Sequence, residues 1–106
     1  MESEIRYEEG IYPDKNWDMI ELPIERDCIV DKETAIQTAK ILLLIEGRHD
    51  KTQNLSYDPT VVFYDTEDMI WIVSFSPFQN GRLIPGDSYN IALRKNNAEV
   101  VKMWID

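Results

Sequence analysis

A single segment of this sequence has the period of an amphipathic helix, and no second helical period follows it. Residues 32–46 place apolar side chains three and four positions apart. Four later segments are instead short and rich in β-branched and aromatic residues. They are residues 60–64, 69–76, 87–95 and 98–105. With no helix between these four strands, parallel pairing lacks a crossover, so we expect an antiparallel meander.

The limits of the helix and its buried face can be predicted from individual residues. Asp31 is suited to cap the first turn, and Gly47 is suited to end the helix. The buried face is expected to consist of Ala35, Ile36, Ala39, Leu42 and Leu43. Three more apolar residues surround the last turn: Ile41, Leu44 and Ile45. We therefore expect other structure to cover that turn on both sides.

Alternation along the strands predicts which side chains share a face. In the second strand Met69, Trp71, Val73 and Phe75 share one face, and Ile70 and Ile72 lie opposite, which indicates a central strand. In the third strand Tyr89, Ile91 and Leu93 share a face. In the last strand Val101, Met103 and Ile105 are expected opposite Val100, Lys102 and Trp104. Residues 96–97, both Asn, predict a two-residue hairpin turn before that strand.

Residues 1–30 lack a strong period and predict an acidic, extended arm. Residues 17–22 are suited to one edge strand, which Pro23 would end because proline cannot donate to a ladder. Residues 31–106 then form the single folded domain, since 106 residues are too few for two. One helix and several strands can bury their apolar sides only against each other. The predicted fold class is α+β, with one main helix on a curved, four-stranded antiparallel sheet.

The charge is strongly negative and unevenly distributed. The chain has 11 basic and 20 acidic residues, a formal net charge of −9, and residues 1–33 hold 11 of the acids. Such a surface repels nucleic acid and anionic membranes and attracts basic partners. An acidic surface that only keeps the protein soluble is an equal alternative.

Several chemistries are disfavoured by counting residues. One cysteine permits no internal disulfide, one histidine permits no two-histidine zinc site, and four scattered glycines make no phosphate-binding loop. His49 beside Asp50 is the one candidate for acid–base work, and a solvated loop residue is the stronger interpretation. Cys28 lies beside Asp27, which disfavours its thiolate. We therefore predict no catalysis, no cofactor and no metal.

No apolar run approaches the roughly 20 residues that span a bilayer. The first residues resemble no signal peptide, since they lack a basic start and an apolar stretch. We expect a cytoplasmic protein.

Two acidic groups are candidates for partner binding. Asp65, Glu67 and Asp68 fall in one predicted turn, where they would face basic side chains of a partner, although acids are also common in turns. Glu8 and Glu9 lie near Tyr7 and Tyr12, a mixture typical of interfaces. A disordered acidic arm is equally compatible with the second group.

Two sets of large apolar residues have alternative interpretations. Phe78, Leu83 and Ile84 lie in a connection rich in Pro and Gly, where they would anchor a partner if exposed. Burial under the sheet edge is the slightly favoured alternative. Trp71 and Trp104 are expected in the core or half-buried.

The order of these motifs resembles a known family over residues 30–106. It comprises the helix start Glu-Thr-Ala-Ile at 33–36, Trp-Ile-Val at 71–73, and Ile-Ala-Leu-Arg-Lys at 91–95 before a hairpin and a Val-Val strand. The chain resembles immunity proteins of the nuclear-transport-factor-2-like, or cystatin-like, fold, which are partners of bacterial polymorphic toxins. It departs from them at Pro85-Gly86, where a glycine pair is frequent, and at 96–97, where Asp-Gly is frequent.

The resemblance implies a non-catalytic protein that binds and neutralises one cognate toxin, and the charge suggests that the toxin domain is basic. A second hypothesis is a small-molecule-binding or enzymatic member of the same fold, with Trp71, Phe75 and Tyr89 lining a pocket between helix and sheet. A peptidase-associated propeptide-type domain shares the same outline and is a third.

Overall fold

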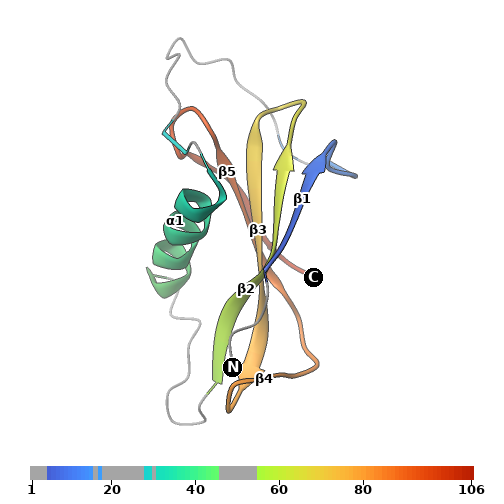
Figure 1. Cartoon of the computed structure of the whole chain (residues 1–106), viewed down its shortest axis with the longest axis vertical. Coiled ribbons are helices and arrows are strands. Elements are labelled where there is room, and N and C mark those ends of the chain that lie inside the picture. The colour runs from blue at the N-terminus through green and yellow to red at the C-terminus, as the bar shows by residue number, and fades with distance from the viewer. Residues whose placement is uncertain (1–4, 16, 18–27, 30, 46–54) are drawn as a thin grey trace.

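The computed structural model describes residues 5–15, 17, 28–29, 31–45 and 55–106. Within them lie one helix and six strands: β1 (Arg6–Gly10), α1 (Lys32–Ile45), β2 (Leu55–Asp65), β3 (Ile70–Gln79), β4 (Arg82–Leu83), β5 (Tyr89–Arg94) and β6 (Val100–Ile105). The strands form one sheet in the order β1-β2-β3-β5-β6, with β4 paired to the end of β3. α1 packs on one face of this twisted sheet (Figure 1). The α+β class, one helix on a mostly antiparallel sheet, is confirmed.

The N-terminal arm contributes an edge strand that was not predicted. β1 pairs parallel with β2, with Arg6 opposite Val61 and Gly10 opposite Asp65. The expectation of only four strands is therefore wrong, whereas the predicted antiparallel meander is confirmed for β2, β3, β5 and β6. Since α1 lies in the chain between β1 and β2, it supplies the crossover that a parallel pair needs. The edge strand expected at 17–22 lies, beyond Trp17, outside the described residues.

β2 and β3 are longer than the alternation predicts. β2 begins at Leu55 rather than at residue 60, and its first residues pair with the end of β3. Pro59 is accommodated because the register shifts between Pro59 and Val61, where a ladder hydrogen bond is not required. β3 continues to Gln79 and turns into β4 through Asn80 and Gly81, both with positive φ, as a tight hairpin turn requires.

The last hairpin differs from the predicted two-residue turn. Ala98, rather than either Asn, has a positive φ of 60°, and its amide donates to the Arg94 carbonyl at 3.0 Å. The loop is therefore longer, and the register of β5 against β6 shifts between Ala92 and Leu93. Val101 and Trp104, predicted on opposite faces, consequently pack against the same cluster.

Apolar side chains pack between helix and sheet and form the main hydrophobic core. The buried residues of this core include Ala35, Ile36, Ala39 and Leu43 from α1, and Val62, Trp71, Val73, Phe75, Ile91 and Leu93 from the sheet. This confirms the predicted helix face and the predicted central position of β3. Trp71 is 5 % exposed, and its indole N–H donates to the Ile29 carbonyl at 3.0 Å. Trp71 and Phe75, expected to line a pocket in the second hypothesis, are packed core residues instead.

The outer side of α1 is open within the described part of the chain. Ile41 is 60 % exposed and Leu44 is 63 % exposed. The expectation that structure covers the last turn on both sides is not met by the described residues. The reason is geometric: a single sheet covers one stripe of a helix, and these two side chains point outside that stripe.

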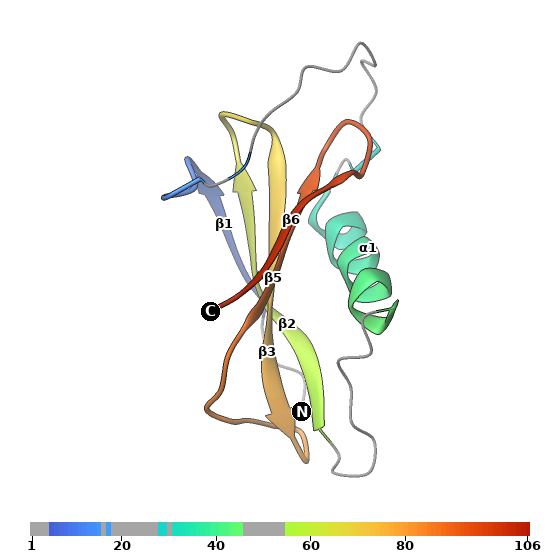
Figure 2. The ribbon, with the colours of Figure 1, turned by 180° about the vertical axis from the view of Figure 1, so that it is seen from behind.

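The opposite face of the sheet, which we call the helix-free face, carries a second, smaller cluster. Its fully buried members are Ile70, Ile72 and Ala92, and five partly buried residues pack against them: Tyr12, Trp17, Phe63, Val101 and Trp104. Figure 2, which shows the molecule from behind, has α1 on the other side of the sheet from this face. Among the described residues α1 is the only helix. Tyr12 and Trp17 come from the segment after β1, so the N-terminal arm covers part of this face.

Leu43 and Leu44 provide a matched test of the buried helix face. Leu43 is 1 % exposed, whereas Leu44 is 63 % exposed one position further along. We expect Leu43→Ala to lower the free energy of unfolding by about 2–5 kcal/mol, because a buried leucine leaves a cavity. Leu44→Ala should change it by about 0.5 kcal/mol or less. Urea denaturation measures both, and equal losses would contradict the helix orientation described here.

Asp31 provides a test of helix capping and its pH dependence. Its Oδ1 accepts a hydrogen bond from the Thr34 amide at 2.8 Å, and hydrogen bonding to Thr34 lowers the pKa of Asp31. Asp31→Ala should lower the free energy of unfolding at neutral pH, and Asp31→Asn should retain most of it, because Asn also caps well. Since the folded pKa is lowered, the advantage of Asp31 over Asn exists above the ordinary pKa of 3.8 and disappears as pH falls below it. The measurement compares the urea midpoints of the original protein and Asp31→Asn. If these midpoints differ by the same amount at neutral and at strongly acidic pH, the assignment is refuted.

Candidate functional site

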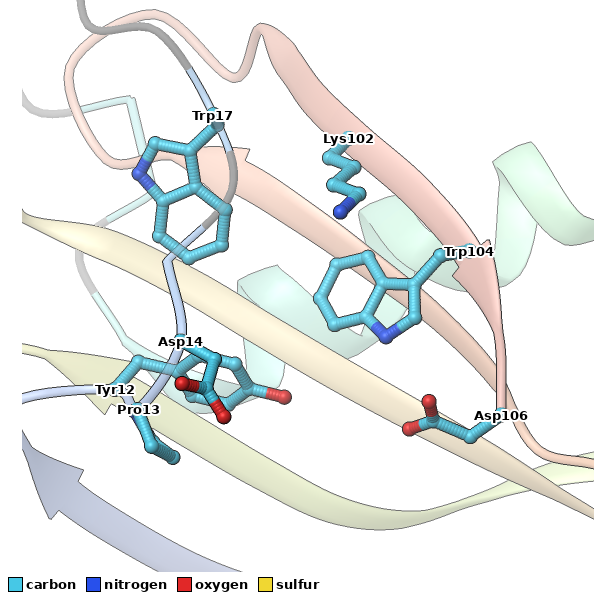
Figure 3. A pocket seen from close by; sticks show the side chains of 7 residues that line it. All are labelled: Tyr12, Pro13, Asp14, Trp17, Lys102, Trp104 and Asp106. Atoms are coloured by element: carbon cyan, nitrogen blue, oxygen red, sulfur yellow. The ribbon is translucent and has the colours of Figure 1, made fainter.

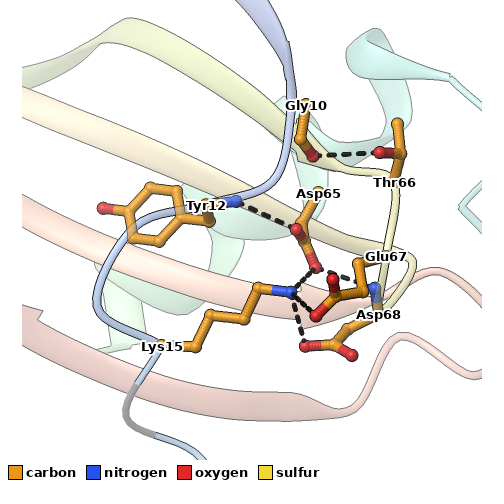
Figure 4. A network of polar contacts seen from close by, with 7 residues as sticks. All are labelled: Gly10, Tyr12, Lys15, Asp65, Thr66, Glu67 and Asp68. Carbon is orange, nitrogen blue, oxygen red and sulfur yellow. Dashed lines mark hydrogen bonds and ion pairs between the residues drawn. The ribbon is translucent and has the colours of Figure 1, made fainter.

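The acidic turn after β2 is held by one lysine from the N-terminal arm. Lys15 Nζ lies 3.1 Å from Asp65 Oδ2, 2.9 Å from Glu67 Oε1 and 3.0 Å from Asp68 Oδ2 (Figure 4). The three acids were predicted to project together toward a partner. The structure instead brings them together around a cation of the same chain.

Asp65 is the centre of this arrangement and is fully buried, with 0 % of its surface exposed. Its carboxylate accepts hydrogen bonds from the Tyr12 amide at 3.0 Å and from the Asp68 amide at 2.8 Å. The expectation that Asp65 faces a partner is therefore wrong, because its oxygens are occupied inside the protein. Glu67, whose side chain is 58 % exposed, still reaches the surface.

The charge state of Lys15 follows from its three partners. Burial acts to lower the pKa of the Lys15 ammonium, but hydrogen bonds with Glu67, Asp68 and Asp65 outweigh it and raise that pKa above its ordinary value. The ammonium therefore stays charged throughout the physiological pH range. We call Lys15, Asp65, Glu67 and Asp68, with the amides that Asp65 accepts, the arm clasp.

A second set of bonds strengthens the attachment of the arm. The Thr66 hydroxyl donates to the Gly10 carbonyl at 3.1 Å (Figure 4). The Thr66 amide donates to the same carbonyl at 2.7 Å. β1 and the segment after it are thus joined to the β2–β3 turn at both Gly10 and Lys15. This attachment places the following side chains over the helix-free face.

Tyr12 is the first of these side chains. Its ring contacts Phe63 edge-on at a centroid distance of 5.1 Å, and its centroid lies 6.2 Å from that of Trp104 and 6.0 Å from that of Trp17. Burial, and secondarily the charge of Asp106, raise the pKa of the Tyr12 phenol. Tyr12 was predicted as a partner-binding residue, and it is half-buried at the centre of an aromatic group.

An open groove of about 330 Å³ lies between the arm and the last strand. Seven residues line it: Tyr12, Pro13, Asp14, Trp17, Lys102, Trp104 and Asp106 (Figure 3). One wall comes from the arm and the other from β6 and the residue after it. Lys102 Nζ lies 5.3 Å from the centroid of the Trp104 ring, within the range of a cation–π contact. We call this site the aromatic groove.

A shallower hollow of about 290 Å³ shares Tyr12 and Asp106 with the aromatic groove and has a polar floor. Ser74 Oγ donates to Asn90 Oδ1 at 2.6 Å, and Asn90 Nδ2 donates to Asp106 Oδ2 at 3.3 Å. An amide oxygen does not act as a base, so this contact does not activate Ser74 as a nucleophile. The hollow is suited to hydrogen bonding with a partner rather than to bond cleavage.

Of the other predicted site residues, Glu8 lines the polar hollow together with Tyr12, and the rest lie elsewhere. Glu8 and Glu9 are exposed on β1, where Glu8 pairs with Arg6 at 3.4 Å and Glu9 accepts from the Tyr7 hydroxyl at 2.9 Å. Phe78 is 5 % exposed within β3, so the alternative of burial holds for Phe78, whereas Leu83 on β4 is 63 % exposed. Cys28 is exposed. His49 and Asp50 lie outside the described residues.

Sequence reasoning did not identify Lys15, Asp14, Lys102 or Asp106 as site residues. One signal was present: Tyr12 and Trp17 are large aromatic residues in an acidic arm that lacks a strong apolar period. Large aromatic residues in such a segment favour packing onto another part of the fold. The position of that packing depends on the arm clasp, which joins residues far apart in the chain.

No family model matches this chain, and comparison with curated proteins and with solved structures gives no match either. In the part of the chain that the structure describes, no helix has the length and apolar character needed to cross a membrane. The same residues bring together no group of three or more His, Cys, Asp or Glu side chains able to hold a metal ion. The geometry of the helix-free face is therefore the main indication of function.

The arm clasp is tested by removing, one at a time, two of the three carboxylates that bind Lys15. Asp65→Ala leaves the Tyr12 and Asp68 amides without their acceptor, which should cost about 1–3 kcal/mol for each amide. Glu67→Ala removes an exposed partner of Lys15 and should cost at most about 1 kcal/mol. Urea denaturation and hydrogen exchange at the Tyr12 amide measure the difference. Equal effects of the two substitutions would show that the buried carboxylate does not hold the arm.

Proposed function

We propose that this protein is a non-catalytic binding protein that neutralises a basic toxin domain by surface contact, as an immunity protein inside the producing cell. One observation carries the binding proposal: the helix-free face has an aromatic groove with carboxylates at its rim. The chain that bears this groove has a net charge of −9. The choice of a toxin as the partner rests on the resemblance of residues 30–106 to immunity proteins.

The electrostatics favour a basic partner over an anionic one. Glu8 and Glu9 are exposed on β1, and Asp14 and Asp106 lie at the aromatic groove. Such a field accelerates the approach of a cationic surface and is screened by salt. Nucleic acid and anionic lipid would be repelled by the same groups.

The side of the sheet that faces α1 offers less support for binding a small molecule. The second hypothesis requires a pocket between helix and sheet. Apolar side chains such as Leu43 and Phe75 pack most of that interface, and the open hollow of about 240 Å³ that remains beside Leu43 and Tyr57 is smaller than the aromatic groove. Interfaces between proteins are enriched in Tyr and Trp at their centres, and the helix-free face presents Tyr12, Trp17 and Trp104. We therefore place the contact surface on the helix-free face.

The proposal is tested with the product of the neighbouring reading frame, expressed in a laboratory bacterium with and without this chain. We expect the product to inhibit growth alone, co-expression to restore growth, and the purified proteins to form a complex. Glu8→Lys should lower the association rate several-fold at low salt and less at high salt, since exposed charges act mainly on encounter. Glu33→Lys makes the same charge change on the exposed start of α1 and should act more weakly. If the two proteins form no complex, the proposed function is contradicted. If the two charge reversals act equally, the proposed contact surface is contradicted.

A further inference from the structure

We infer that the aromatic groove is a binding site for a lysine or arginine side chain of the partner, and that Lys102 occupies this site in the free protein. The inference rests on the proposed function, which it deepens by naming what the groove receives. It assigns Lys102 the role of an internal competitor.

The groove already holds an ammonium group. Lys102 Nζ lies 5.3 Å from the Trp104 ring centroid, and Figure 3 shows its side chain reaching toward the space between Trp17 and Trp104. An ammonium near the face of an indole is attracted by the negative potential of the ring. The same ring attracts any cation of that kind.

The charges that line the groove also favour a cation. Of the seven residues that line the groove, Asp14 and Asp106 are acidic and Lys102 is basic. When Lys102 swings into solvent, the groove keeps two carboxylates and loses its cation. A lysine side chain has a flexible four-carbon stem, so this exchange requires no movement of the backbone. The exposed groove is then complementary to an incoming cation and repels phosphate.

The part of the groove wall formed by residues 12–15 is fixed in advance. The Tyr12 amide donates to the buried Asp65, and Lys15 pairs with the same carboxylate. These bonds lie on both sides of Asp14, whose positive φ of 52° turns the chain at the groove rim. A wall that is already ordered loses little entropy when a side chain binds. A volume of about 330 Å³ accepts a single long side chain.

The three tryptophans allow a direct test by NMR with hexalysine as the probe. In ¹⁵N-labelled protein, the indole N–H signals of Trp17 and Trp104 should shift on titration. The Trp71 signal should not, because its indole donates to the Ile29 carbonyl in the core on the other face. Hexalysine with every side-chain amine acetylated should shift none of them. Shifts confined to residues away from the groove would overturn this inference and leave the proposed basic partner intact.

The role of Lys102 is tested with a pair of variants that change the net charge equally. Lys102→Gln should increase the affinity for hexalysine several-fold, since it removes both one positive charge and the competing ammonium. Lys40→Gln removes one exposed positive charge from α1 and measures the long-range contribution alone. Equal increases would overturn the internal-competitor role. Asn tolerates the same backbone conformation as Asp14. Asp14→Asn should therefore weaken hexalysine binding both in the original protein and in the Lys102→Gln variant. Unchanged binding would remove Asp14 from the site.

Discussion

The buried carboxylate of Asp65 is the contact on which the helix-free face depends. A fully buried charge is tolerated only when it is paired and hydrogen-bonded. Asp65 meets this requirement with Lys15 and two amides, all of them within the arm or the adjacent turn. One residue therefore secures both the end of β1, where Gly10 lies opposite Asp65, and the segment that forms the groove wall.

The parts of the fold that follow from local periodicity could be predicted from the sequence. The helix, its Asp31 cap and the two apolar faces of β3 each depend on residues a few positions apart. β1 could not be predicted in this way. Its five residues have no apolar alternation, and it is held by a strand more than fifty residues later. The prediction of the last hairpin was wrong for a local reason, because Ala98 adopts the positive φ that was expected of Asn.

The site was harder to predict than the fold because similar residues have different surroundings. Asp65 and Glu67 belong to the same acidic turn, and composition does not distinguish them. The burial of their side chains distinguishes them. Asp65 lies inward at the end of β2, where Lys15 reaches it, and Glu67 points outward. The aromatic groove has the same origin, since Tyr12 meets Trp17 and Trp104 only once residues 11–15 lie across the sheet.

An internal cation in a cation site has a consequence for selectivity. A strongly acidic protein meets many basic molecules, and its charge attracts all of them at long range. If every ligand must displace Lys102 from the Trp104 ring, isolated cations gain little, because they exchange one ammonium for another. A partner gains only when its cation arrives with further contacts, such as hydrogen bonds in the adjoining polar hollow around Ser74 and Asn90. On the proposed function, Lys102 would thus convert a general attraction for positive charge into a preference for a partner that fits the whole face.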